Sequence, residues 1–386
     1  MNNGYRPTHY SLLIIHYSTN LQIMKKLLIL VILLPILAFG QRSKNTAVFP
    51  HNVIFIVGDG MGPAQVYTSV VAQGDKSAFL MFPFTGFSRT YSHNRYTTDS
   101  GAGGSALMTG KKVDNHHIAL DPDGKWNPSF LTTAKMLWGK AAGFVVTSSV
   151  LDATPASTYA HVTNRKLYDS ISMQMAQCDY DVMIGGDKNH FLPENRKDGL
   201  SPLDTLQARG YKMAYNLLDL SLLKGRKICG LLSEDNPARA PERGRMLTLS
   251  TLKAIETLSK NDEGFCLMVE GSQIDWACHN NDSAYLAAEM ADFEDMLKAV
   301  LDFAKRDGHT LVIVTADHET GGLTLLNGDI QNGVSNTTWA TSGHSGVMVP
   351  VFAYGPGAEN FSGIQQNEDF FMKILTLLSK EYWPKY

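Results

Sequence analysis

Cysteine is scarce in this sequence of 386 residues, with four copies at positions 178, 229, 266 and 278. No two of them form a C-x-x-C pair, which argues against a zinc knuckle built on cysteines. The pairing of the four stays open, although Cys266 lies in an apolar run and is expected in the core. An excess of one charge is also missing, because 34 Lys and Arg stand against 37 Asp and Glu. That balance gives no electrostatic case for binding nucleic acid or an acidic membrane.

Internal repeats and low-complexity segments are missing as well. With 44% hydrophobic and 18% charged residues, the composition is typical of a globular enzyme with a large core, in one large domain or two.

The apolar run at the N-terminus is shorter than a typical membrane-spanning helix. The run 27–39 has 13 residues, fewer than the roughly 17–25 of a transmembrane helix. It follows Met24-Lys25-Lys26 and precedes a polar stretch, which is the pattern of a signal peptide; a buried core strand or helix is the alternative. We interpret 1–23 as a start assigned too early, 24–40 as a signal peptide and 41–386 as a single domain. The protein is then expected to be exported, periplasmic or secreted, without a membrane anchor after cleavage.

Strand-like runs alternate with helix-like segments along the rest of the chain. The predicted strands are 52–57, 143–148, 181–184, 228–232, 264–269 and 309–315. The predicted helices include 102–108, 131–141, 171–177, 247–258, 284–305 and 368–379. This order predicts an α/β fold with a parallel or mixed sheet and helices on both faces.

Acidic residues recur where the predicted strands end. Asp59, Asp152 and Glu270 each follow or end a strand, and Asp317-His318 follows another. In open α/β sheets, ligands bind beyond the carboxyl ends of the strands. We therefore expect the functional site at this edge.

The stretch TTDSGAGGSALMTGKK places Ser100 at the start of a predicted helix rich in small residues. Unpaired N–H groups and the helix dipole suit an anion there, or a Ser that becomes phosphorylated. An ordinary N-cap Ser is the alternative.

Three further motifs carry histidine. Asp275 and His279 are four residues apart, so a helical turn would place both on one face. Asp317 and His318 precede a Gly-Gly turn, and His344 lies in a loop between glycines. A surface pair, a capping Asp with a buried His, and an ordinary loop His are the respective alternatives.

Together these residues form one inventory of ligands. Three His and three carboxylates fit two zinc ions, and oxygen ligands fit magnesium. Two metals about 3.5–4 Å apart form the clamp used for in-line phosphoryl displacement. Arg165 could hold a phosphate with its bidentate fork, or make a surface salt bridge.

From about Asn52 to its end the chain resembles the alkaline phosphatase family. The motifs IVGDGMG, TDSGAGGSALMTGKK, DATPAS, TYAHVTNR, VEGSQIDWACH, TADHETGG and SGHSG occur in the family's order. The resemblance implies a three-layer αβα sandwich with a mostly parallel sheet, and often a homodimer. It also implies a nucleophile, a phosphate clamp, two Zn²⁺ and one Mg²⁺.

The resemblance assigns these roles to residues of this chain. It makes Ser100 the nucleophile and Arg165 the phosphate clamp. One zinc is held by Asp275, His279 and His344, and the other by Asp59, Asp317 and His318. The magnesium is held by Asp59, Thr154 and Glu270, with Asp152 in or just behind that shell.

Two features depart from the family pattern. Trp276 stands where some bacterial members carry Lys, and only 25 residues separate His318 from His344, which implies a reduced crown insertion. His116 and His117 match no ligand position but follow the nucleophile helix.

We interpret the chain as a broad-specificity hydrolase of small phosphate monoesters. A phosphodiesterase or sulfatase of related fold is the alternative within enzymes. A non-catalytic exported protein that binds metal or phosphate is the alternative outside them.

Overall fold

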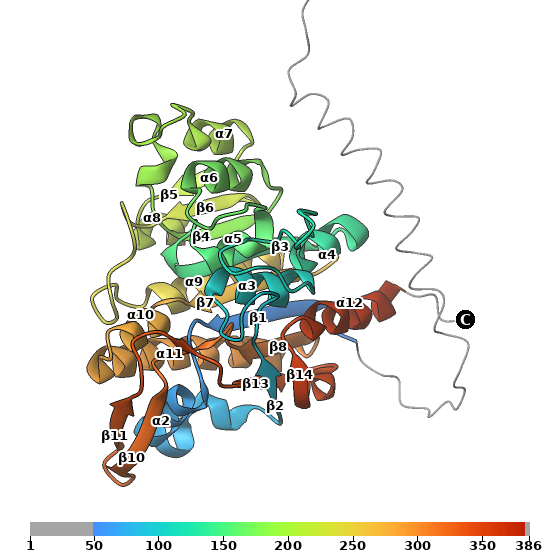
Figure 1. Cartoon of the computed structure of the whole chain (residues 1–386). Coiled ribbons are helices and arrows are strands. Elements are labelled where there is room, and N and C mark those ends of the chain that lie inside the picture. Colours follow the sequence, from blue (N-terminus) through green and yellow to red (C-terminus); the bar gives the residue numbers. More distant parts are fainter. Residues whose placement is uncertain (1–48, 383–386) are drawn as a thin grey trace, which may run out of the picture. The chain divides into compact units, whose positions relative to one another are not determined.

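The computed structural model describes residues 49–382 (Figure 1). The predicted early start and signal peptide, at 1–23 and 24–40, lie outside these residues. Within the described part of the chain, no helix combines the length and apolarity needed to cross a membrane.

A ten-stranded sheet forms the centre of the molecule, and β13 is its one strand that runs against both neighbours. All other strand pairings of the sheet are parallel. In spatial order, the strands are β14 (Gly363–Gln366), β2 (Phe84–Arg89), β13 (Val349–Tyr354), β8 (Thr310–Thr315), β1 (Asn52–Gly58), β7 (Phe265–Gly271), β3 (Ala141–Ser149), β4 (Val182–Gly186), β6 (Ile228–Leu231) and β5 (Lys212–Ala214).

Helices cover both faces of this sheet, because its central strands are apolar on both sides. Along β1, Val53, Phe55 and Val57 belong to one hydrophobic core, and Ile54 and Ile56 belong to the other. The first core is shared with α3 (Ser100–Thr109), α4 (Phe130–Trp138), α5 (Ala153–Tyr159), α6 (Tyr168–Gln177), α7 (Pro202–Ala208) and α12 (Asp369–Tyr382). The second core is shared with α2 (Pro63–Gln73), α8 (Leu217–Leu222), α9 (Met246–Leu258), α10 (Gln273–His279) and α11 (Ser283–Asp307).

Smaller elements complete the described chain. Short 3-10 turns occur as η1 (Gly74–Lys76), η2 (Ala78–Met81), η3 (Asn189–Phe191), η4 (Pro193–Asn195) and η5 (Ala358–Phe361). Between His318 and His344 the chain forms the hairpin of β10 (Leu323–Asp329) and β11 (Val334–Trp339). The ends of this segment pair as β9 (Glu319–Thr320) with β12 (His344–Ser345). The hairpin projects away from the central sheet in Figure 1.

The predicted α/β sandwich with a mostly parallel sheet is confirmed. Several boundaries were wrong: the helix predicted over 131–141, for example, ends at Trp138, because Gly139 caps it in the left-handed conformation (φ 70°) and β3 begins at Ala141. The strand predicted over 264–269 instead starts after Gly264, which has φ 74°, and continues through Glu270. Cys266 is buried as predicted, and all four cysteines are unpaired.

Candidate active site

Three neighbouring strands deliver carboxylates to one edge of the sheet. Val57 of β1 lies opposite Glu270 of β7 on one side and opposite Thr315 of β8 on the other. Because the three strands are parallel and in register, Asp59, Glu270 and Asp317 leave the sheet at the same edge. The predicted site therefore contains buried acidic side chains at the ends of three central strands.

The first cluster consists of Asp59, Asp317 and His318. The Nε2 atom of His318 lies 3.4 Å from Asp59 Oδ1 and 3.2 Å from Asp317 Oδ2. Its Nδ1 atom lies 3.2 Å from Thr320 Oγ1, and that hydroxyl donates its single proton to Asp275 Oδ1 at 2.5 Å. Thr320 can then only accept from His318, so Nδ1 carries the imidazole proton and Nε2 presents a lone pair. A lone pair aimed at two carboxylates fits a cation between them.

Burial and like charge shift the pKa values of this cluster. Burial and the like charges of Asp317, Asp275 and Glu270 raise the pKa of Asp59. Burial and the charge of Asp275 raise the pKa of Asp317 to about 6. Burial lowers the pKa of His318 to about 4, so the ring is neutral at pH 7. Asp59 Oδ1 and Asp317 Oδ2 are buried without a hydrogen-bond partner among residues 49–382, a state that a divalent cation would relieve.

The second cluster consists of Asp275, His279 and His344. Helix α10 places Asp275 and His279 one turn apart, with His279 Nε2 at 3.3 Å from Asp275 Oδ2 and 3.1 Å from His344 Nε2. Both imidazoles face a backbone carbonyl through Nδ1: Ser342 O for His279 at 2.6 Å and Thr98 O for His344 at 2.9 Å. A carbonyl only accepts, so each Nδ1 is protonated and each Nε2 is directed to the shared centre.

The contacts within this second cluster shift the pKa values of its members. The hydrogen bond to Asp275 raises the pKa of His279 to about 9. Burial alone would raise the pKa of Asp275, but its contact with His279 lowers it to about 2. Burial lowers the pKa of His344 to about 4. The centre thus holds one positive charge between a carboxylate and two imidazoles, and a divalent metal can replace that proton.

Oxygen ligands lie beside these two clusters. Glu270 pairs in register with Val146 of β3, and Thr154 and Asp152 follow β3 at the start of α5. Burial raises the pKa of Glu270 to about 8, with Asp152 and Asp317 adding like charge. Burial also raises the pKa of Asp152. The hydroxyl of Thr154 is buried and makes no hydrogen bond of good geometry among the described residues, although it lies near enough to Glu270 to lower the pKa of that carboxyl. An all-oxygen set with an orphaned hydroxyl fits magnesium.

Ser100 is the first residue of α3 and not its cap. Asp99 precedes it in extended conformation and accepts a hydrogen bond from the Ala102 N–H at 3.0 Å. The alternative of an ordinary N-cap Ser is therefore wrong. With Asp99 as cap, the Ser100 hydroxyl is free to face the first cluster, and its Oγ lies 3.2 Å from His318 Nε2.

The small residues of α3 have a steric reason. A Cβ on Gly103 would come within 2.9 Å of the Asp317 carbonyl oxygen, which is closer than real contacts allow. Glycine at this position lets the helix lie directly against the loop that carries Asp317 and His318. The GAGG sequence thus brings Ser100 to the first cluster.

Arg165 contacts Asp99, the residue that caps α3 and precedes Ser100. Its Nη1 donates to Asp99 Oδ2 at 3.2 Å. Burial alone would lower the pKa of Arg165, but the carboxylates of Asp152, Asp99 and Asp59 raise it, so the guanidinium stays charged. A charged fork held by the residue that precedes Ser100 can bind a phosphate.

Sequence reasoning missed roles for two residues. Asp99 orients both Ser100 and Arg165, and an Asp at an N-cap position was the available signal. Thr320 fixes the tautomer of His318. It lies two residues further along the chain, and no pattern indicated that it would turn back onto this ring.

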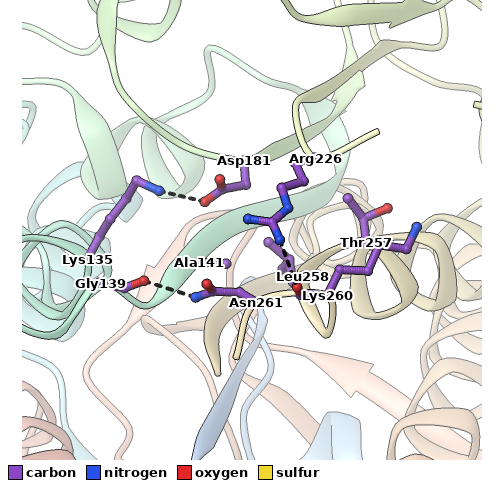
Figure 2. Close-up of a pocket in the computed structure, with 9 residues that line it drawn as sticks. All are labelled: Lys135, Gly139, Ala141, Asp181, Arg226, Thr257, Leu258, Lys260 and Asn261. Carbon is purple, nitrogen blue, oxygen red and sulfur yellow. Dashed lines mark hydrogen bonds and ion pairs between the residues drawn. The ribbon is translucent and has the colours of Figure 1, made fainter. Parts of the chain in front are cut away.

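A separate cavity of about 180 Å³ lies at the opposite ends of the strands, next to Ala141 at the start of β3 (Figure 2). Its lining includes Lys135, Asp181, Arg226 and Lys260 and none of the predicted site residues. Lys135 pairs with Asp181 at 2.8 Å, and Arg226 donates to the Lys260 carbonyl at 3.4 Å. These cations lie near the C-terminal ends of α4 and α9, where they offset the helix dipoles. Their presence therefore has a structural explanation, and we do not interpret the cavity as an alternative functional site.

Comparison with known proteins supports the resemblance. A family model described as alkaline phosphatase matches residues 50–333. Alkaline phosphatase 4 of Bacillus subtilis is 34% identical, over 83% of this chain and 87% of its own. Alkaline phosphatase of Escherichia coli is 30% identical, over 85% of this chain and 86% of its own. The solved structure of alkaline phosphatase from the Antarctic bacterium TAB5 is 36% identical, with a TM-score of 0.81 over 88% of this chain and 100% of that one. A mutant of that enzyme has been solved with magnesium bound.

Proposed function

The chain belongs to the alkaline phosphatase family of phosphomonoesterases, and on this premise we propose that it hydrolyses phosphate monoesters through a phosphoserine at Ser100. One observation carries the proposal: the Ser100 hydroxyl faces the unprotonated Nε2 of His318, which also faces two buried carboxylates. A nucleophile at the edge of a built cation site is what phosphoryl transfer requires.

We assign three metals to this centre. Asp275, His279 and His344 would hold one Zn²⁺, and their mixed nitrogen and oxygen donors suit that ion. The second Zn²⁺ would be held by Asp59, Asp317 and His318. Mg²⁺ would be held by Asp59, Thr154 and Glu270, with Asp152 in or just behind its shell. When bound, these ions supply positive charge that stabilises the Ser100 alkoxide and the oxygen of the leaving group.

The side chains of this chain divide the remaining work. Arg165 binds two phosphate oxygens and orients phosphorus in front of Ser100. Ser100 Oγ bonds to phosphorus while the ester P–O bond breaks. The alcohol leaves with one proton, which balances the proton that Ser100 gave up. A water molecule then displaces Ser100 Oγ and gives inorganic phosphate. Asp99 keeps both Ser100 and Arg165 in place throughout.

The substrate we propose is a small-molecule monoester, with broad specificity. Our proposal that the protein acts outside the cytoplasm is based only on the signal-peptide pattern at 24–40. A homodimer stays a prediction of the resemblance, and sedimentation equilibrium would test it.

Steady-state rates on p-nitrophenyl phosphate, bis-p-nitrophenyl phosphate and p-nitrophenyl sulfate test the proposal. We expect the monoester to be hydrolysed fastest by orders of magnitude, EDTA to abolish the activity, and zinc with magnesium to restore it. A faster diester rate would favour a phosphodiesterase. Fast sulfate hydrolysis would favour a sulfatase, against which the GAGG sequence after Ser100 argues. Full activity in a demonstrably metal-free sample would refute the metal assignment, and metal binding without hydrolysis of any ester would favour a non-catalytic protein.

A further inference from the structure

His116 contacts the carboxylate that orients the catalytic groups, although it matches no ligand position. Its backbone N–H donates to Asp99 Oδ1 at 3.1 Å, and its Nδ1 lies 3.2 Å from Asp99 Oδ2. Its carbonyl accepts the Arg165 N–H at 2.8 Å. The residue therefore touches both Asp99 and Arg165 and is connected to them through backbone and side chain.

The backbone of His116 is unusual for a histidine. Its φ of 72° lies in the left-handed region that glycine and asparagine tolerate best. The side chain is 67% exposed, so no packing of the ring into the core explains its presence. The strained residue contacts Asp99 and Arg165 of the proposed site, and such conformations often serve function.

The Asp99 carboxylate is shared among several donors. Oδ1 accepts the N–H groups of Ala102 and His116. Oδ2 faces two side chains at the same distance, Arg165 Nη1 at 3.2 Å and His116 Nδ1 at 3.2 Å. Burial would raise the pKa of Asp99, but the Arg165 charge and these N–H groups lower it, so the carboxylate is ionised.

Asp99 and a bound phosphate compete for the same guanidinium. If Asp99 Oδ2 attracts the Arg165 guanidinium more strongly, Arg165 holds phosphate less firmly. The His116 Nδ1 atom, in close polar contact with Oδ2 at 3.2 Å, draws on part of the carboxylate charge. We propose that His116 is a positioning residue that weakens the hold of Asp99 on Arg165 and so sets the affinity for phosphate. This inference rests on the proposed function only in that phosphate is the ligand of Arg165.

Two substitutions separate the imidazole from the backbone. His116→Gly keeps the left-handed backbone and removes the contact of Nδ1 with Oδ2. His116→Asn also tolerates φ 72°, and its side-chain nitrogen can take the place of Nδ1 beside Oδ2. His93→Asn is the matched control, because His93 pairs with Asp114 at 2.7 Å on the same loop and makes no described contact with Asp99 or Arg165.

The measurement is the dissociation constant of inorganic phosphate for the zinc- and magnesium-loaded protein, by calorimetry, together with kcat and KM on p-nitrophenyl phosphate. We expect His116→Gly to raise the phosphate Kd by about 3–10-fold, as for loss of one ordinary polar interaction. KM should rise with it, and kcat should change less. His116→Asn should restore most of the affinity, and His93→Asn should leave it unchanged. An unchanged Kd in His116→Gly, or no rescue by Asn, would overturn the proposal.

A double-mutant cycle distinguishes positioning from direct contact with phosphate. Asp99→Asn keeps the capping oxygen and removes the charge. In that background His116→Gly should not change the phosphate Kd further, because the competition is gone. A full additional loss would mean that the ring itself binds phosphate and would overturn the positioning role. A parent protein that binds phosphate but hydrolyses no ester would refute the proposed function and leave this inference intact.

Discussion

Ser100 Oγ lies 3.2 Å from His318 Nε2, although the two residues are 218 positions apart in the sequence. The first begins helix α3, and the second follows strand β8. Glycine at position 103 permits this approach, and Thr320 fixes the tautomer that leaves Nε2 unprotonated. Ser100 and the cluster of Asp59, Asp317 and His318 are therefore brought together by contacts that do not need the hydroxyl of Ser100.

Removing that hydroxyl should abolish turnover without emptying the metal sites. We expect Ser100→Ala to lower kcat by about 10³-fold or more, because no other group of the site can form the covalent bond to phosphorus. Zinc and magnesium contents, by elemental analysis, should match those of the parent, since the clusters keep all their side chains. Undiminished phosphate release by this variant would reject the covalent route.

Arg165 should not be replaceable by lysine. A lysine keeps the charge but cannot bind two phosphate oxygens at once, and it would also lose the geometry of the bond to Asp99. We expect both Arg165→Lys and Arg165→Ala to lower kcat/KM by about 10²-fold, with a weaker inhibition by inorganic phosphate. Initial-rate kinetics check this. Parent-like values for the lysine variant would show that charge alone suffices.

Local patterns made much of this fold predictable from the sequence. The strand 52–57 and its neighbours are continuous apolar runs, and such runs directly encode burial on both faces. Short strands such as β5, and exposed ones such as β10 and β11, carry no such signal. The helix predicted over 131–141 overran because its stop lies in the backbone of Gly139.

The same division holds within the site. Asp317 with His318, and Asp275 with His279, are close in sequence, so their spacing alone predicts that each pair can share a metal. The contact of Asp99 with Arg165 and His116 depends on the path of the loop after α3. That path is set by tertiary contacts, and no periodicity in the sequence reports it.

The metal-free protein should lose stability as pH rises from about 6.5 to 8. Burial raises the pKa of Glu270 to about 8 from 4.5 and raises that of Asp59 also. The folded chain then holds protons that the unfolded chain has lost, so its free energy of unfolding falls as these protons leave. The lowered pKa values of His318 and His344 have the opposite effect, but only below their ordinary value of 6.5.

Thermal unfolding of EDTA-treated protein between pH 6.5 and 8 tests this pH dependence. Glu270→Gln should flatten the fall, because glutamine does not titrate. Zinc and magnesium should abolish or reverse the fall, since they bind the deprotonated ligands. A metal-free melting temperature that stays level or rises over this range would contradict the expectation.

Each metal cluster should lose its own ion when one ligand is removed. His344 shares its centre with Asp275 and His279 and makes no part of the first cluster. We therefore expect His344→Ala to reduce zinc from two ions per chain to one and to lower activity by more than about 10²-fold. The control is His309→Ala, an exposed histidine that precedes β8 at the other end of the strand, and it should change neither. Elemental analysis after dialysis gives the count, and a variant that still holds two zinc ions would separate His344 from the centre and require another residue as its third ligand.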